Sequence, residues 1–198
     1  MDKQIFIDKV RQAQGKHNPV PMPTFDENDT VSTTATRGGA KAAFMRNFTA
    51  NHGDVFESCD SLVEFLKSKG CKTGVADAKL SDLFGLEKHF EISREFDRQN
   101  NPDGYDFGIS KASFAIGENG AIVFKDSDTA DRLNTIAPWI HVAVVDSKSI
   151  VSTLPEGLAQ TVDSPYAVYV TGPSKTTDVE GVLVEGVHGP GVQAVLIV

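Results

Sequence analysis

The octapeptide WIHVAVVD, residues 139–146, decides the fold class of this chain. Apart from His141 and the final Asp146 it is apolar at consecutive positions rather than at alternate ones. That pattern is typical of a strand covered on both faces, as in the parallel sheet of an α/β protein. The runs YAVYVTG (166–172) and VQAVLIV (192–198) have the same character, and we expect them to be further buried strands.

Helices and strands alternate through the rest of the chain. Ser61 and Glu64 form a capping-box pattern for a helix that ends near Gly70. Asn119-Gly120 lies between two apolar runs, the strongest short-range signal of a β-hairpin. We therefore predict a three-layer α/β/α domain with a mostly parallel sheet and an inserted hairpin. Further helices are expected at 36–51, 80–86, 129–136 and 148–160, and strands at 54–58, 72–77 and 89–93.

The chain divides into an arm and a domain. Residues 1–34 combine an amphipathic helical segment, with Ile5, Phe6 and Val10 on one face, and a proline-rich linker. Residues 35–198 form the α/β domain. Charges interrupt the apolar residues of the N-terminus, and no run approaches the ~20 apolar residues of a membrane helix. We expect a cytoplasmic protein.

The composition restricts the partners. The formal net charge is -8, with 27 acidic and 19 basic residues, which disfavours binding to nucleic acid or anionic membranes. The two cysteines, Cys59 and Cys71, form no CxxC pair, and an iron–sulfur cluster normally needs four ligands. No histidine pair has metal-ligand spacing, so we predict no metal or other cofactor in this chain.

The glycine-rich stretch TGPSKTTDVEGVLVEGVHGP, residues 171–190, is the first candidate site. It follows a predicted buried strand, and ligands gather where loops leave the carboxyl ends of strands. Lys175 supplies a cation, and a helix beginning after Thr177 would add free N–H groups for a phosphate or carboxylate. The alternative is an ordinary turn, because Thr177 and Glu180 also form a capping box. The predicted ligand-binding residues are Gly172, Pro173, Ser174, Lys175, Thr176, Thr177, Asp178 and Gly189.

Two residues are candidates for catalysis. Glu118, in the turn GENG, could act as a nucleophile or general base if it is partly desolvated, or it could be a solvated turn residue. His188, in GVHGP, could transfer a proton near neutral pH. His141 lies inside an apolar run, where a histidine is more often part of the core.

The segment TGPSKTTDVE, followed by GVHGP and a terminal apolar strand, resembles the C-terminal signature of LUD-domain proteins of the lactate-utilisation protein C group. FGISKASFAIGENGAIVF (107–124) and WIHVAVV match the order of elements in that family. The resemblance implies a fold like that of ribose-phosphate isomerases and CoA transferases. It also implies an accessory role in oxidising L-lactate or a related organic acid, with iron–sulfur clusters on partner proteins and a small anionic ligand on this chain. The resemblance leaves open whether the chain forms a homo-oligomer.

The chain departs from the family at two positions. Lys175 stands where the family often has arginine, and Asn119 stands where threonine is more usual. GENG is thereby closer to the signature around the catalytic glutamate of CoA transferases. A second hypothesis is therefore acyl transfer with Glu118 as the nucleophile. A third is a metabolite-binding module without chemistry.

Overall fold

The computed structural model describes residues 3–13, 21, 24, 26, 32–99, 103–129, 131–177 and 181–198. The chain divides into two units, Met1–Thr30 and Val31–Val198. The first unit holds helix α1 (Lys3–Ala13), which was expected from its apolar spacing; none of its residues is buried. Among the described residues, no helix has both the length and the apolar character needed to cross a membrane.

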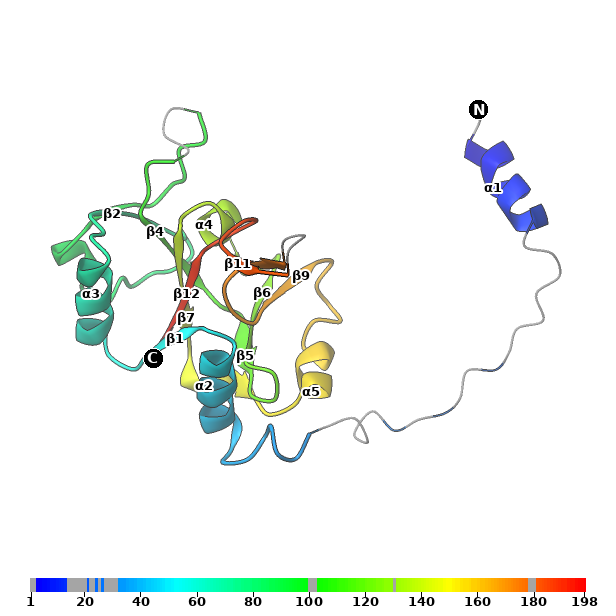
Figure 1. Cartoon of the computed structure of the whole chain (residues 1–198), viewed down its shortest axis with the longest axis horizontal. Coiled ribbons are helices and arrows are strands. Elements are labelled where there is room, and N and C mark those ends of the chain that lie inside the picture. The colour runs from blue at the N-terminus through cyan, green and yellow to red at the C-terminus, as the bar shows by residue number, and fades with distance from the viewer. Residues whose placement is uncertain are drawn as a thin grey trace. The chain divides into compact units, whose positions relative to one another are not determined.

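The second unit is built on a six-stranded sheet in which every neighbouring pair is parallel (Figure 1). All residues of its central strand, Ile140–Val145, are buried, so the continuous apolar run does mark a strand covered on both faces. The α/β class and the mostly parallel sheet are confirmed. In spatial order the strands are β1 (Asp54–Phe56), β12 (Val192–Ile197), β7 (Ile140–Val145), β4 (Phe107–Lys111), β2 (Thr73–Ala76) and β3 (Glu91–Ser93).

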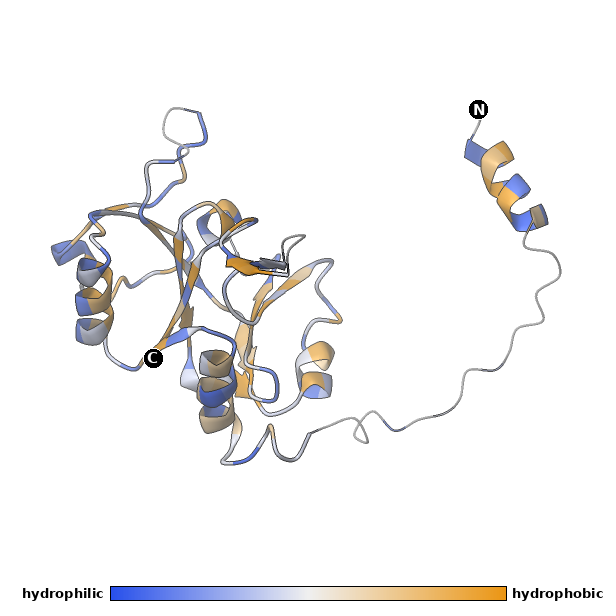
Figure 2. Cartoon of the chain, viewed as in Figure 1, coloured by the Kyte–Doolittle hydropathy of each residue, from blue (hydrophilic) through white to orange (hydrophobic). Residues whose placement is uncertain are grey.

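Different elements cover the two faces of this sheet. Helix α3 (Cys59–Ser68) packs Leu62 and Leu66 against one face, together with the segment that leads into the 3₁₀-helix η2 (Leu86–Lys88). Helix α2 (Ala40–Ala50) packs Phe44 and Phe48 against the other face, beside a second sheet. Figure 2 shows the hydrophobic residues concentrated on the strands between these layers.

The second sheet has four strands in the order β8 (Ile150–Val151), β5 (Phe114–Ile116), β6 (Ala121–Lys125) and β9 (Ala167–Val170). Strands β5 and β6 form the hairpin predicted from Asn119-Gly120. Gly120 has φ +68°, and a Cβ there would lie 2.5 Å from the Phe48 backbone nitrogen, so the turn needs glycine. The prediction for YAVYV was wrong: β9 is a half-buried edge strand that pairs with β6 and lies outside the parallel sheet.

Several helix predictions are corrected by local contacts. Ser58, not Ser61, is the N-cap of α3, because its hydroxyl accepts the Ser61 N–H. Helix α2 begins only at Ala40, because Gly38 and Gly39 have φ near +90°. The other expected helices are shorter: 80–86 is replaced by η2, 129–136 by α4 (Leu133–Ile136), and 148–160 by the 3₁₀-helix η3 (Ser147–Ser149), β8 and α5 (Leu154–Ala159).

Candidate functional site

The glycine-rich stretch 171–190 folds as a β-hairpin rather than a loop leading into a helix. Strand β10 (Lys175–Thr177) pairs antiparallel with β11 (Leu183–Glu185). A helix beginning after Thr177 was the condition for an anion site made of free N–H groups, and that condition is not supported, because the described residues on both sides of 178–180 form paired strands. Asp178 lies outside the described residues.

Lys175 and Gly172 both contact the carboxyl end of α2. The Lys175 ammonium donates to the backbone oxygen of Asn51 at 2.8 Å, where the helix dipole favours a cation. A Cβ on Gly172 would lie 2.3 Å from that same oxygen, so the close approach requires glycine. Of the remaining predicted residues, Pro173 is buried, Thr176 is half-buried, and Thr177 is exposed.

Ser174 joins the start of this stretch to its end. Its backbone N–H donates to the Pro190 oxygen at 3.0 Å, and its hydroxyl accepts the His188 N–H at 3.2 Å. The nearest atom to a Cβ on Gly189 would be the Ser174 Cβ, at 3.5 Å. The fold thus brings Ser174, His188 and Gly189 together, with the His188 side chain exposed.

Glu118 uses both oxygens of its carboxylate on backbone amides. Oε1 accepts the Ser32 N–H at 2.8 Å, and Oε2 accepts the Leu154 N–H at 2.9 Å, in the first turn of α5. The turn that carries Glu118 is held by α2, because the Asn51 side chain donates to the Asn119 oxygen at 3.1 Å. Asn51 therefore connects this turn with Lys175, while the Glu118 carboxylate and the Lys175 ammonium bond to different groups.

Neither the core histidine nor the thiols form a reactive site. His141 is fully buried, and its Nδ1 lies 2.8 Å from Gln193 Nε2; burial lowers its pKa to about 4. Burial raises the pKa of Cys71 to about 11 and also raises that of Cys59, so both thiols are protonated near neutral pH. In the part of the chain that the structure describes, no group of three or more histidine, cysteine or acidic residues could hold a metal.

A cavity of about 340 Å³ lies at the carboxyl edge of the parallel sheet. The segment after β2 packs Leu80 against the α3 face, whereas the segment after β4 leads into β5, which packs Ala115 on the opposite face. Two segments that leave on opposite faces open a crevice between their strands, and ligands of open α/β sheets bind at such a point. The lining residues are Leu80, Ser81, Asp82, Phe84, Lys111, Ala112, Ser113, Val144, Asp146, Ser149 and Val198.

The charged groups of the cavity restrict its ligands. Lys111, the last residue of β4, is exposed and forms no ion pair with any residue that the structure describes. Two carboxylates, Asp82 and Asp146, each accept one backbone N–H of their own loop. One lysine and two aspartates give the lining side chains a formal charge of -1, which repels a phosphate or a dicarboxylate, whereas Lys111 can attract a single carboxylate.

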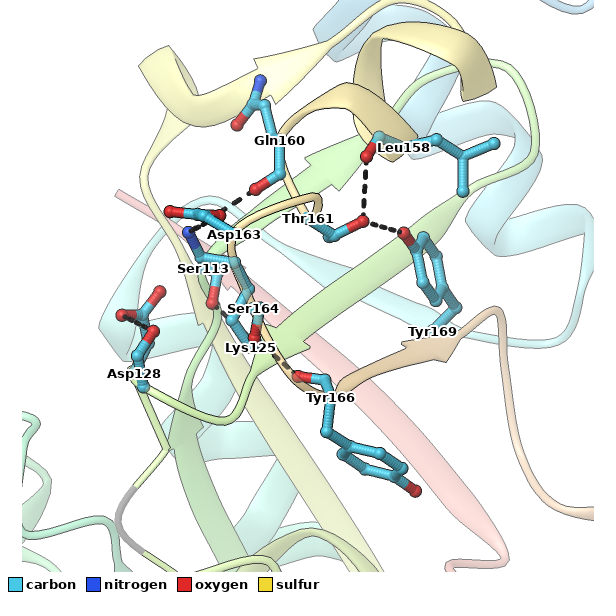
Figure 3. Close-up of polar contacts among 11 residues, drawn as sticks. Ser113, Lys125, Asp128, Leu158, Gln160, Thr161, Asp163, Ser164, Tyr166 and Tyr169 are labelled. Carbon is cyan, nitrogen blue, oxygen red and sulfur yellow. Dashed lines mark hydrogen bonds and ion pairs between the residues drawn. The ribbon is translucent and has the colours of Figure 1, made fainter.

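Ser113 connects the cavity to a polar network behind it. Its oxygen accepts the Lys125 N–H at 2.9 Å, and the Asp128 side chain lies nearby (Figure 3). The neighbouring Ser113 hydroxyl, with smaller effects of Ser127 and of the nearby Lys125 and Lys79, holds the pKa of Asp128 below its ordinary value despite partial burial. Asp128 is therefore ionised near neutral pH and can only accept hydrogen bonds.

Sequence reasoning missed this cavity because its residues come from four separate segments. One signal was present: polar residues follow directly on several apolar strands, as Lys111 follows FGIS and Asp146 follows IHVAVV. We instead predicted a binding site at the carboxyl end of YAVYV, but that strand belongs to the second sheet.

The proteins that this chain is similar to are consistent with the observed α/β fold. The family model of the LUD domain matches residues 42–198. Lactate utilization protein C from Bacillus subtilis is 32% identical over 99 residues, which cover 46% of this chain and 41% of that protein. The protein of the same name from Deinococcus radiodurans is 34% identical over 101 residues, or 48% of each chain. The chain thus spans less than half the length of these curated relatives.

A solved structure shares the architecture. The crystal structure of a DUF162 family protein from Deinococcus radiodurans superposes with a TM-score of 0.57 at 18% identity, over 79% of this chain and 97% of that one. At this sequence identity, the structural similarity shows a shared fold only. Because the family model covers nearly all of the α/β unit, the chain belongs to the LUD domain family.

Proposed function

We propose that this LUD-domain protein takes part in lactate utilisation and binds a small carboxylic acid, such as lactate, in the cavity at the carboxyl edge of the parallel sheet. The observation that carries the proposal is Lys111, a residue of the cavity lining whose ammonium has no described ion-pair partner. An ammonium of this kind attracts one carboxylate. The names of the curated relatives supply the metabolic context.

The redox centre of such a system would reside on partner proteins. The two cysteines of this chain are too few for the four ligands of an iron–sulfur cluster, and both thiols have raised pKa values. We therefore propose an accessory role, in which this chain holds the organic acid and a cluster-bearing partner accepts the electrons. Affinity purification of the native protein should recover iron–sulfur proteins; their consistent absence would contradict this part of the proposal.

The two hypotheses centred on the predicted site residues have less support. Acyl transfer by Glu118 would require its carboxylate to leave the Ser32 and Leu154 amides. Ligand binding at Gly172–Asp178 with His188 would compete with the bond between Lys175 and Asn51. The second of these, binding at the hairpin, is a proposal that thermal unfolding with lactate can separate from binding in the cavity.

Thermal unfolding in the presence of L-lactate tests the binding site. A ligand that binds only the folded state at 100 times its Kd stabilises it by about 2.7 kcal/mol, so the unfolding midpoint should rise. Lys111→Met should abolish that rise, whereas Lys88→Met, a matched change of an exposed lysine on η2, should preserve it. An unchanged rise in Lys111→Met would contradict the cavity as the site, and a loss in Lys175→Met instead would assign it to the hairpin.

A further inference from the structure

Strand register places an apolar surface directly beside Lys111. Lys111 of β4 is paired with Val144 of β7, and the two strands are parallel. Side chains alternate between the two faces of a sheet, and Phe107, Ile109 and Val144 all lie in the hydrophobic core on the α3 side. Lys111 follows Ile109 by two positions, so its side chain leaves the sheet on that same side. The lysine side chain therefore starts next to that of Val144.

Two more residues of the cavity lining belong to the same hydrophobic core. Leu80 is buried in this core, and Phe84 is half-buried and packs against it. Both residues lie on the segment between β2 and η2. The lining next to Lys111 is thus apolar and continuous with the core. We call the surface formed by Leu80, Phe84 and Val144 the apolar wall.

The backbone at Phe84 has a conformation that bulky residues rarely adopt. Its φ is +55°, in the left-handed region, and its N–H donates to Asp82 Oδ1 at 2.7 Å. A glycine would adopt this conformation without strain, yet the chain has a phenylalanine here. Strained residues persist where the surrounding structure holds them, and they cluster at sites that contact ligands. The strain at Phe84 therefore indicates a role for its side chain in the cavity.

The cavity is larger than lactate. Its volume of about 340 Å³ lies within the ~300–1,000 Å³ typical of ligand pockets, whereas lactate occupies on the order of 90 Å³, the share of about three water molecules. With its carboxylate on Lys111, lactate would cover little of the apolar wall with its methyl group. A larger apolar group would remove more of this wall from water, and the gain in affinity grows with the apolar area buried.

We propose that the cavity binds monocarboxylic acids whose substituent is an apolar group larger than the methyl group of lactate, and that this group packs on the apolar wall. The inference rests on the proposed function, since it names the substrate class of the same cavity. Asp82 and Asp146 add the requirement that the substituent be uncharged, because both carboxylates would repel a second acid group.

Isothermal titration with three 2-hydroxy acids tests the inference. L-lactate is the reference, L-2-hydroxy-4-methylpentanoate has an isobutyl group in place of the methyl group, and L-malate has a carboxymethyl group there. A fully buried methylene group contributes roughly a factor of four to affinity. Because the cavity is partly open, the isobutyl acid should bind about tenfold more tightly than lactate. Malate should bind more weakly than lactate, because its second carboxylate meets the two aspartates.

A change at Phe84 tests the place of the substituent. Phe84→Gly removes the ring and suits the backbone at φ +55°, so the protein should keep its fold. The preference for the isobutyl acid should then fall to roughly threefold or less. Leu83→Ala is the matched control, because Leu83 is half-buried and packs against the same core but lies outside the cavity lining. This variant should keep the tenfold preference, since a loss of stability alone weakens all three acids alike.

The possible outcomes separate the inference from the proposed function. If lactate binds as tightly as the isobutyl acid, the inference is overturned while the proposed function stands. Malate binding as tightly as the isobutyl acid would also overturn it, because size alone would then explain the gain. An equal preference in the wild type and in Phe84→Gly would overturn the packing of the substituent on the apolar wall. Binding of none of the three acids would overturn both proposals.

Discussion

The buried histidine of the parallel sheet should make the stability of this protein depend on pH. His141 lies in β7, in register with Gly108 of β4 and Gln193 of β12, and is 0% exposed. Its Nε2 atom is buried without a hydrogen-bond partner in the described structure. Protonation would place a charge in this environment, and the loss of solvation lowers the pKa from 6.5 to about 4.

The direction and size of the effect follow from proton linkage. Between pH 6.5 and about 4 the histidine of the unfolded chain is protonated, while the folded chain keeps it neutral. The unfolded state therefore binds more protons, and the free energy of unfolding falls as the pH drops through this window. Each unit of pKa shift corresponds to 1.36 kcal/mol, so the total loss due to His141 is about 3 kcal/mol, with no further change above pH 6.5.

Urea unfolding followed by circular dichroism, repeated from pH 4 to pH 8, measures this effect. The control is His141→Gln, which keeps a side chain able to bond Gln193 but cannot titrate. Between pH 6.5 and pH 4, the free energy of unfolding of the wild type should fall by about 3 kcal/mol more than that of the variant. His52, His89 and His188 are exposed and are shared by both proteins. Identical pH profiles for the two proteins would refute the reasoning.

Two further changes test the turn that carries Glu118. Gly120→Ala should lower the free energy of unfolding by about 2–4 kcal/mol, because the new Cβ would lie 2.5 Å from the Phe48 backbone. Gly85→Ala, at φ +82° with open space around it, should lower it by only about 1 kcal/mol, and equal losses in urea unfolding would contradict the packing argument. Glu118→Gln should reduce stability by about 1 kcal/mol, because it removes a negative charge from the first turn of α5. An unchanged melting temperature in this variant would show that the carboxylate does not support that helix.

The elements that could be predicted are those whose signal lies within a few neighbouring residues. The run Ile140–Val145 is buried at every position, as its composition indicates. The Asn119-Gly120 turn gives the expected hairpin, because its backbone conformation depends on the glycine itself. The motifs from Phe107 to Val198 were also sufficient to indicate the family, which the match over residues 42–198 shows.

The predictions that failed depended on which segments meet in space. YAVYV has the composition of a buried strand, yet it lies at the edge of the second sheet, since strand pairing depends on the path of the whole chain. The same holds for the partners of the predicted site residues. Lys175 bonds a residue 124 positions away, and Glu118 one that is 86 positions away. No local pattern specifies such partners.

The sequence by itself determined the α/β class, the hairpin turn and the family. Strand burial and turn conformation depend on residues that are neighbours along the chain, so they can be recognised locally. Only the tertiary structure decided which polar groups are free to meet a ligand. It engages Glu118 and Lys175 with backbone groups, and it assembles Lys111, Ser113, Asp146 and Ser149 around one cavity. The physical reason is that a binding site at the edge of a parallel sheet is formed by loops that are distant along the chain and adjacent only after the strands have paired.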